Sequence, residues 1–544
     1  MNRNRRTQPR RRGVAALAIV VLMALLALAI VGMVMGGARD MDLTVSRMET
    51  LRAMYASEGG AEMAMREVRN NTDADGDGNI GGVSDDGNAA NNPTIGGASV
   101  WVDRTAVTGG ATLDVRGSTA VARRNLQISL SEASASLVVY GANPSTTPQT
   151  RSWTGSAWSS PVSTLNIGGQ PRWINIATCP TRNEALFVAS DWFKDVNAMV
   201  YNGSTWGNLI ELCTDMGTRS DRPLAAAYEQ LSGDAIVAFR KGHSDDIYYR
   251  IWNGTSWGSE QSTTTMSGDQ PRFIRMFAKP GTDTIILLSL DDRNDLTGMV
   301  WNGSSWGSKV LLDNDAFTHS EECMDVAFES LSGDGLIAWS RSGQTTLRYR
   351  TYTSGGWGSD TAGPNVGAEA RWVRLAADPA SDKVAAMTLD DEYDVNAAMW
   401  SGTVFGGATE FETSATTRDK RGIVVAFEPA GTRAVAVYAE GSSTSPRYRV
   451  YDGSNWSSEL TGPNLSDDFA AFQMAPVGTG QEILTLAITR GQDRLKFMKW
   501  NGSSFVNATE LEDDLAGSDT HECAMIASRA TSASVVSSVV AVEP

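Results

Sequence analysis

Three arginine–aspartate pairs recur at fixed positions and are the residues best placed to do chemistry. Arg172, Arg272 and Arg371 each stand 29 residues before an aromatic residue, and Asp191, Asp291 and Asp390 each stand 10 residues before the same aromatic. In a fourth copy both members change together, to Ala471 and Arg490. Joint loss favours an ion pair in which the guanidinium fork binds the carboxylate through two hydrogen bonds. A structural ion pair is therefore favoured over a ligand-binding face.

No catalytic set can be assembled from the sequence. The chain has three histidines, and no Ser-His-Asp arrangement, phosphate-binding loop or metal-ligand cluster is present in it. The three arginines could imitate the carboxylate-binding cluster of a sialidase-like glycoside hydrolase, but the paired aspartates would neutralise them. We therefore expect a protein that is not an enzyme, with the sialidase-like hydrolase as the less favoured alternative.

An acidic loop offers a candidate calcium site. Asp73, Asp75, Asp77 and Asn79 occupy the first ligand positions of an EF-hand-like loop, with Gly78 at position six and Ile80 at position eight. Position twelve should carry a bidentate carboxylate, but it is Ser84, and Asp85 comes one residue late. Calcium is thus the one cofactor that the sequence suggests, and a solvated acidic loop is the alternative.

The overall charge and the cysteines exclude other classes. The formal net charge is −17 although six arginines lie within the first twelve residues. Nucleic acid is therefore not an expected partner, since phosphate binding needs a basic surface. The four cysteines lack CxxC spacing and nearby histidines, so we expect buried free thiols and neither disulfides nor a zinc site.

A repeated aromatic motif organises the last four hundred residues. The motif reads aromatic-x-Gly-x-x-aromatic, and its leading residues stand 48 to 51 residues apart. Short strands at this period are typical of a β-propeller with one four-stranded blade per repeat. Each copy is expected to be a hairpin with a two-residue turn between the third and fourth strands. The repeat aromatics are Trp153, Trp158, Tyr201, Trp206, Trp252, Trp257, Trp301, Trp306, Tyr352, Trp357, Trp400, Tyr451, Trp456 and Trp500. This motif resembles repeats of propeller lectins, in which aromatics stack on sugars, but packing between blades is favoured for most of them.

The repeats alternate between two kinds. One kind carries a Tyr-Arg pair before the motif, and the other carries methionine at the arginine position. A closed ring of alternating blades needs an even number, which predicts eight blades, with seven as the alternative. Strands from both ends would complete the eighth blade, and residues 137–140 and 535–542 compete for one place in it.

The first seventy residues predict a membrane helix. An arginine-rich stretch precedes Gly13, and residues 14–35 carry no charge, a length that can cross a bilayer. The positive flank should stay cytoplasmic, while a cleaved signal peptide is the alternative. Apolar residues continue at helical spacing to about Arg69.

The basic leader, the glycine before an apolar helix and the segment 56–62 (Ala-Ser-Glu-Gly-Gly-Ala-Glu) together resemble the type IV pilin-like family. The similarity is greatest to its minor, PilX-like members and to pseudopilins. It implies prepilin peptidase cleavage between Gly13 and Val14, and packing of the helix among other pilin-like subunits. Ala18 stands where many members carry glutamate, which departs from the pattern of a major subunit.

The expected organisation is therefore mainly β. Residues 1–13 form a leader, 14–69 a transmembrane and pilin-like helix, 70–131 a small Gly/Asp-rich head, and 132–544 the propeller. The expected function is that of a minor pilin or pseudopilin that displays the propeller for adhesion or for binding a glycan or protein. It would lie in the inner membrane before assembly and then at the cell surface or in the periplasm. An anchored propeller that enters no filament is the alternative.

Overall fold

The computed structural model describes most of the chain after residue 37. The described residues are 38–70, 73–74, 79–83, 93–107, 110–132, 136–263, 268–318, 320–415, 420–516, 523–528 and 534–542. The leader, Gly13, Val14 and the apolar run at 14–35 lie outside them. In the part that is described, no helix is long and apolar enough to span a membrane. The chain divides into two compact units, one of residues 1–133 and 532–544 and the other of residues 134–531.

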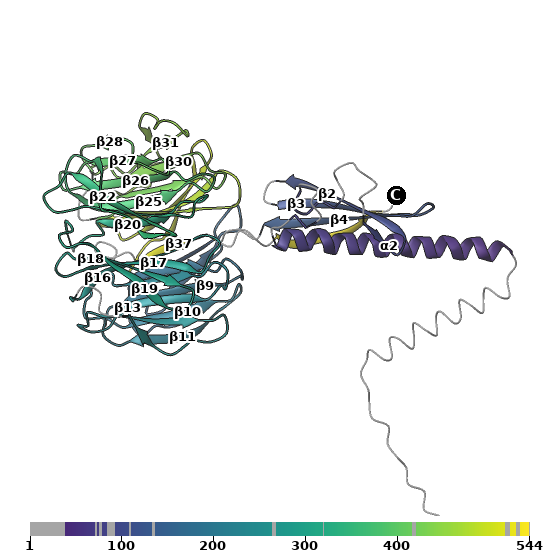
Figure 1. Cartoon of the computed structure of the whole chain (residues 1–544), viewed down its shortest axis with the longest axis horizontal. Helices are drawn as coiled ribbons and strands as arrows, with labels where there is room; N and C mark the ends of the chain where they lie inside the picture. The colour runs from purple at the N-terminus through teal and green to yellow at the C-terminus, as the bar shows by residue number, and fades with distance from the viewer. Residues whose placement is uncertain are drawn as a thin grey trace, which may run out of the picture. The chain divides into compact units, whose positions relative to one another are not determined.

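The first unit is one long helix on an antiparallel sheet. Helix α2 (Ala38–Asn70) lies along a face of the sheet (Figure 1), and it contacts β2, β3 and β4. Ala53, Ala56 and Ala64 on its sheet side are buried. At Gly117 a Cβ atom would lie 2.0 Å from the Ala53 carbonyl oxygen, so glycine permits this close approach. The sheet order is β1 (Thr94–Ile95), β2 (Ala98–Val107), β3 (Gly110–Ser118), β4 (Arg123–Glu132) and β38 (Ser534–Val542).

The last strand, β38, corrects the predicted domain boundary. It pairs antiparallel with β4, with Val539 opposite Ile128, so it belongs to the first unit. The prediction that the propeller extends to residue 544 is therefore wrong. The reason is that β5 (Leu137–Tyr140) already occupies the second place in the closing sheet, which leaves the edge of β4 as the partner for β38.

The second unit is made of sheets that mostly contain four antiparallel strands. Each sheet runs through consecutive strands of the sequence, apart from the one that closes the ring. The first of these sheets consists of β8 (Pro171–Thr178), β9 (Ala185–Asp191), β10 (Val196–Tyr201) and β11 (Trp206–Cys213), and the second of β12 (Leu224–Tyr228), β13 (Ala235–Arg240), β14 (Ile247–Trp252) and β15 (Gln261–Ser262). The third sheet consists of β16 (Pro271–Ala278), β17 (Thr284–Asp291), β18 (Leu296–Asn302) and β19 (Trp306–Asp313). The fourth sheet consists of β20 (Met324–Phe328), β21 (Gly335–Trp339), β22 (Thr346–Thr353), β23 (Gly356–Trp357) and β24 (Thr361–Asn365).

The remaining sheets complete the unit. They are β25 (Ala370–Ala377), β26 (Val384–Asp390), β27 (Val395–Trp400) and β28 (Thr409–Glu412); β29 (Ile423–Phe427), β30 (Ala434–Tyr438), β31 (Arg447–Tyr451) and β32 (Leu460–Thr461); β33 (Phe469–Pro476), β34 (Glu482–Thr489), β35 (Leu495–Asn501) and β36 (Phe505–Glu512); and β37 (Ala524–Ala527), β5, β6 (Gln149–Ser152) and β7 (Val162–Ser163). The described strands thus form eight sheets in this unit.

The first strands of these sheets form a closed ring. β8, β12, β16, β20, β25, β29, β33 and β37 contact one another in this order, and β37 also contacts β8. This is the arrangement of a β-propeller, so the mainly β prediction is confirmed, and the described sheets match eight blades and not seven. The closing sheet combines β37, yellow near the end of the chain in Figure 1, with three strands from residues 137–163.

The repeat motif forms the hairpin between the third and fourth strands. Trp301 is opposite Trp306, and the Asn302 N–H donates to the Ser305 carbonyl at 3.2 Å, so Gly303 and Ser304 form the predicted two-residue turn. The Asn302 side-chain oxygen accepts the backbone N–H groups of Ser304 and Ser305 at 3.0 and 2.9 Å. Gly303 has a φ of +90°, a conformation that side chains disfavour. The motif therefore encodes an Asx-stabilised turn.

Candidate functional site

The leading aromatics of the motif lie between neighbouring sheets. In each copy the two aromatic rings contact each other, with centroids 4.9 to 5.4 Å apart. The buried indoles of Trp252, Trp400 and Trp500 donate to Glu184, Glu329 and Glu428 of the preceding sheet at 2.9, 2.5 and 2.8 Å. Trp301 likewise donates to Glu229. These residues therefore hold the ring together and are not exposed for sugar stacking.

This contact predicts a loss of stability in Trp400→Phe. The substitution removes the donor to Glu329, whose carboxylate is buried, and a lost hydrogen bond to a buried charged group costs about 1–3 kcal/mol. Trp306→Phe is the matched control, because the Trp306 indole nitrogen is buried in the described chain without a hydrogen-bond partner. Urea unfolding of both variants measures the difference. Equal losses would show that the Trp400–Glu329 hydrogen bond contributes nothing.

The repeated arginines do not form the predicted pairs. Arg272 bonds to Asp292 and, at 2.9 Å, to Asp221 of the preceding sheet. Arg371 similarly binds Asp391 at 2.7 Å and Glu321 at 2.9 Å. The acid partner is thus the residue after Asp291 or Asp390, and a second acid comes from the neighbouring blade.

A β-bulge explains the error of one residue. Pro271 is opposite Asp291, but Phe273 is opposite Leu290, so Arg272 is the extra residue and its side chain leaves the ladder. Meanwhile the Asp291 carboxylate accepts the backbone N–H groups of Arg293 and Asp295, both at 2.9 Å. The carboxylate at this position thus stabilises its own turn. The aspartates therefore have the structural role that the sequence predicted, but their partners are backbone N–H groups and not the repeated arginines.

Asp191 and Asp390 are buried carboxylates with raised pKa values. Oδ1 of Asp191 accepts the N–H groups of Phe193 and Asp195 at 2.8 and 3.0 Å, while Oδ2 is buried without a hydrogen-bond partner. Burial raises the pKa of Asp191 to about 6, and the nearby Asp195 charge adds to this, against the backbone hydrogen bonds. The pKa of Asp390 also rises to about 6, chiefly by burial.

Asp191→Asn is expected to stabilise the protein at neutral pH. The native pKa exceeds the ordinary value of 3.8, so the native state binds more protons between about pH 4 and pH 6, and wild-type stability falls as pH rises through that window. The variant should lack this decline and be more stable by up to ~3 kcal/mol above pH 6. Asp215→Asn is the control for which the opposite change in stability is expected, because the hydrogen bond from Lys194 lowers the pKa of Asp215. Thermal unfolding from pH 4 to 8 tests this, and an unchanged pH profile would contradict it.

Of the three blades that carry the repeated arginine, one has an exposed aromatic beside it. Trp192 stands where the other two of these blades have Asp292 and Asp391, and its side chain is 48% exposed. The guanidinium carbons of Arg172 and Arg219 lie 4.8 and 5.2 Å from its ring centroid. Burial lowers the pKa of Arg172, and the neighbouring Arg219 adds to this. Exposed Phe193 adjoins them. We call Trp192, Phe193, Arg172 and Arg219 the aromatic patch.

Sequence reasoning identified Arg172 but missed the rest of the aromatic patch. The available signal was the break in the repeat, since an indole replaces an acid at one position of three. An indole between two guanidinium groups offers an apolar surface with hydrogen-bond donors at its edges. Such a surface can bind a sugar ring or a protein side chain.

The candidate calcium loop is described only in part. Asp73 and Asn79 are described, whereas Asp75, Asp77, Ser84 and Asp85 lie outside the described residues. The buried carboxylate of Glu67 accepts the N–H groups of Ala74 and Gly81, both at 2.9 Å, and so ties the loop to the end of α2. Among the residues described, no group of three or more metal-ligating side chains occurs. Calcium remains a prediction.

All four cysteines are free and buried, as the sequence predicted. Burial raises the pKa of Cys323 to about 12, so this thiol stays protonated at neutral pH.

Comparison with known proteins finds similar structures but no relative in sequence. No protein family matches the chain, and no curated protein matches it. The BP39L lectin of Burkholderia pseudomallei is 11% identical, with a TM-score of 0.47 over 63% of this chain and 99% of that one. AztD of Citrobacter koseri is 9% identical, with a TM-score of 0.45 over 73% and 98%. The six-bladed fungal lectin of Aleuria aurantia is 12% identical, with a TM-score of 0.32 over 58% and 95%.

Proposed function

We propose that this chain is a non-enzymatic surface protein in which a pilin-like N-terminal region presents a β-propeller for adhesion or ligand binding. The observation that carries the proposal is an exposed apolar stripe on α2. Val45, Met48, Leu51 and Tyr55 recur at helical spacing, and their side chains are 49 to 59% exposed. A contiguous apolar stripe of this kind marks an interaction surface.

The stripe suits packing against other helices. Since the sheet side of α2 is already covered, the exposed stripe provides a second apolar face on the same helix. It follows in sequence the apolar run at residues 14–35, which would hold the chain in the inner membrane before assembly. Other pilin-like subunits are therefore the proposed partners, and the cell surface or the periplasm is the proposed final location.

Analysis of the mature N-terminus tests the first half of the proposal. Protein isolated from its native membrane should begin at Val14, with the mass of an N-methylated chain. A Met1 or Asn2 start would instead indicate an anchored propeller outside any filament, and cleavage beyond residue 35 would indicate a secreted protein. Leu51→Glu should prevent co-purification with filament subunits, whereas Leu51→Met, which keeps the side chain apolar, should not.

The aromatic patch is the proposed ligand site on the propeller. Its exposed indole is suited to stacking on a sugar or on a protein side chain, and it is flanked by two cationic groups. Trp192→Ala should weaken binding to any glycan that a glycan array identifies by about tenfold or more. Leu331→Ala, at a residue that is 73% exposed elsewhere on the propeller, is the control. Equal glycan binding by the two variants would exclude the aromatic patch as the ligand site.

A further inference from the structure

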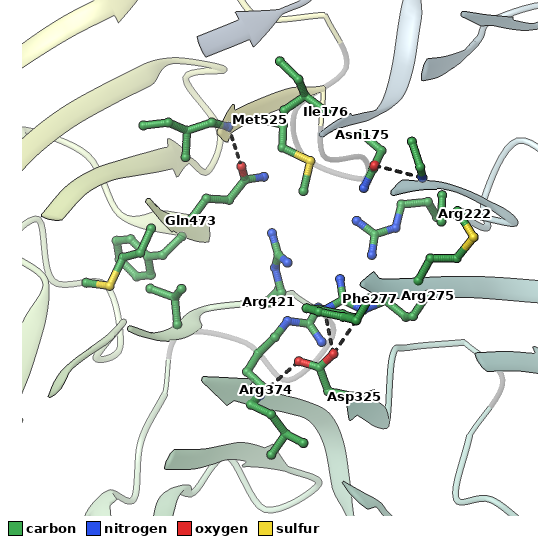
Figure 2. A pocket seen from close by; sticks show the side chains of 18 of the residues that line it. Asn175, Ile176, Arg222, Arg275, Phe277, Asp325, Arg374, Arg421, Gln473 and Met525 are labelled. Carbon is green, nitrogen blue, oxygen red and sulfur yellow. Dashed lines mark hydrogen bonds and ion pairs between the residues drawn. The ribbon is translucent and has the colours of Figure 1, made fainter. Parts of the chain in front are cut away.

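The centre of the propeller contains a pocket that the proposed function does not use. The pocket has a volume of about 270 Å³ and is lined by the first strands of all eight sheets. Arg222, Arg275, Arg374 and Arg421 enter it from different sides, and their guanidinium groups point inward (Figure 2). Arg222, Arg374 and Arg421 are almost fully buried, with exposures of 1%, 6% and 6%.

Two carboxylates partly compensate the four guanidinium groups. Glu322 bonds to Arg222 and, at 2.6 Å, to Arg374, and it lies 3.9 Å from Arg275. Asp325 binds Arg275 at 2.7 Å, and its other oxygen accepts the N–H of Leu375 at 2.9 Å. Each guanidinium group carries five N–H donors. On Arg374 the two terminal nitrogens donate to the Val373 carbonyl at 2.7 Å and to Glu322, whereas Nε is buried without a hydrogen-bond partner.

The described cluster carries an excess of positive charge. Among the described residues that line the pocket or pair with its arginines, four arginines stand against two acids, Glu322 and Asp325. Burial lowers the pKa of Arg374 to about 9, and the charges of Arg421 and Arg275 act in the same direction, against Glu322 and Asp325. Buried excess charge is costly, and a bound counter-charge would relieve it.

We infer that this central pocket binds a small tetrahedral oxyanion, phosphate or sulfate, through Arg374 together with Arg222 and Arg421. Planar guanidinium groups bind oxyanions through paired hydrogen bonds. The pocket falls just below the usual 300–1,000 Å³ of ligand sites, so it suits a small anion better than an oligosaccharide. The site is distinct from the aromatic patch, and it does not depend on filament assembly.

Thermal unfolding and calorimetry of the full-length protein in detergent test the inference. The protein is first freed of phosphate and sulfate, and each anion is then added at constant ionic strength maintained with sodium chloride. We expect one equivalent to bind and the Tm of the propeller to rise saturably at low millimolar concentration. Saturation by phosphate alone, sulfate alone or both supports the site and identifies its anion. The absence of a saturable rise and of binding heat would overturn it, since general salt effects do not saturate in this range.

The variant Arg374→Gln provides a second test of the inference. It should weaken oxyanion binding by at least tenfold while the circular dichroism of the propeller is retained. Arg421→Gln gives the same test if the first variant does not fold. Arg293→Gln is the matched control, because Arg293 is 74% exposed and pairs with Asp269 away from the pocket lining. Wild-type oxyanion binding by folded Arg374→Gln or folded Arg421→Gln would also overturn the inference.

Discussion

A chain that stops after Ala516 is expected to lose the cooperative unfolding transition of the propeller, whereas a chain that stops after Ser528 should keep it. The difference between them is β37, the first strand of the closing sheet, which lies between β33 and β8 in the ring. Cys523, Ala524 and Ile526 bring buried side chains to this position. Without β37, β5 loses its paired strand and the ring is open between β33 and β8, so we expect a loss of about 5 kcal/mol or more from apolar burial and strand hydrogen bonds.

Specific contacts strengthen this expectation. Gln473 of β33 donates to the carbonyl of Ala524 at 2.8 Å and accepts the N–H of Ile526 at 3.1 Å. Thr178 of β8 donates to the carbonyl of Ser528 at 2.9 Å. Removal of β37 therefore breaks the ring on both sides. Calorimetry of the two truncated chains and the full-length protein measures the effect.

The chain that stops after Ser528 is the control because it lacks only β38 among the described strands. That strand belongs to the first unit, where it covers the edge of β4. Its removal should lower the stability of the first unit and leave the propeller transition in place. If both truncated chains unfolded like the full-length protein, closure by β37 would contribute nothing to stability.

The general architecture of the propeller could be predicted because its determinants are local and repeated. A short polar turn with glycine and its flanking aromatics mark each blade, and alternation of the two repeat kinds predicts an even number. The closing strand could not be chosen from the sequence. Residues 137–140 and 535–542 are both rich in valine, and only their pairing partners, β37 and β4, distinguish them.

The candidate sites were harder to predict, since they depend on contacts between blades. The bulge that displaces Arg272 shifts the register by one residue, and no local pattern predicts where a bulge will occur. Arg222, Glu322 and Arg421 occupy one repeat position, and opposite charges at that position could have indicated a central cluster. Burial and the mutual approach of these groups become visible only when the ring is closed.

Glu322→Gln is expected to be the most destabilising single substitution in the central cluster. It removes a buried carboxylate that pairs with Arg222 and Arg374 and leaves their charges uncompensated. Loss of one partner in a buried ion pair costs about 3–5 kcal/mol. Glu260→Gln is the control, because Glu260 pairs with Lys241 at 2.8 Å near the surface, where such a pair contributes only about 0–1 kcal/mol. Chemical unfolding of the two variants at pH 7 gives the comparison.

The pH dependence identifies the origin of this loss. Burial alone would raise the pKa of Glu322, but attraction to Arg222, Arg374, Arg275 and Arg421 outweighs burial and holds the pKa well below its ordinary value of 4.5. A depressed native pKa contributes stability above the unfolded value, and this contribution is lost as pH falls below about 4.5. The unfolding free energies of wild type and Glu322→Gln should therefore differ most above pH 5 and converge on acidification. A difference that stayed constant down to pH 2 would attribute the loss to packing and not to the charge of Glu322.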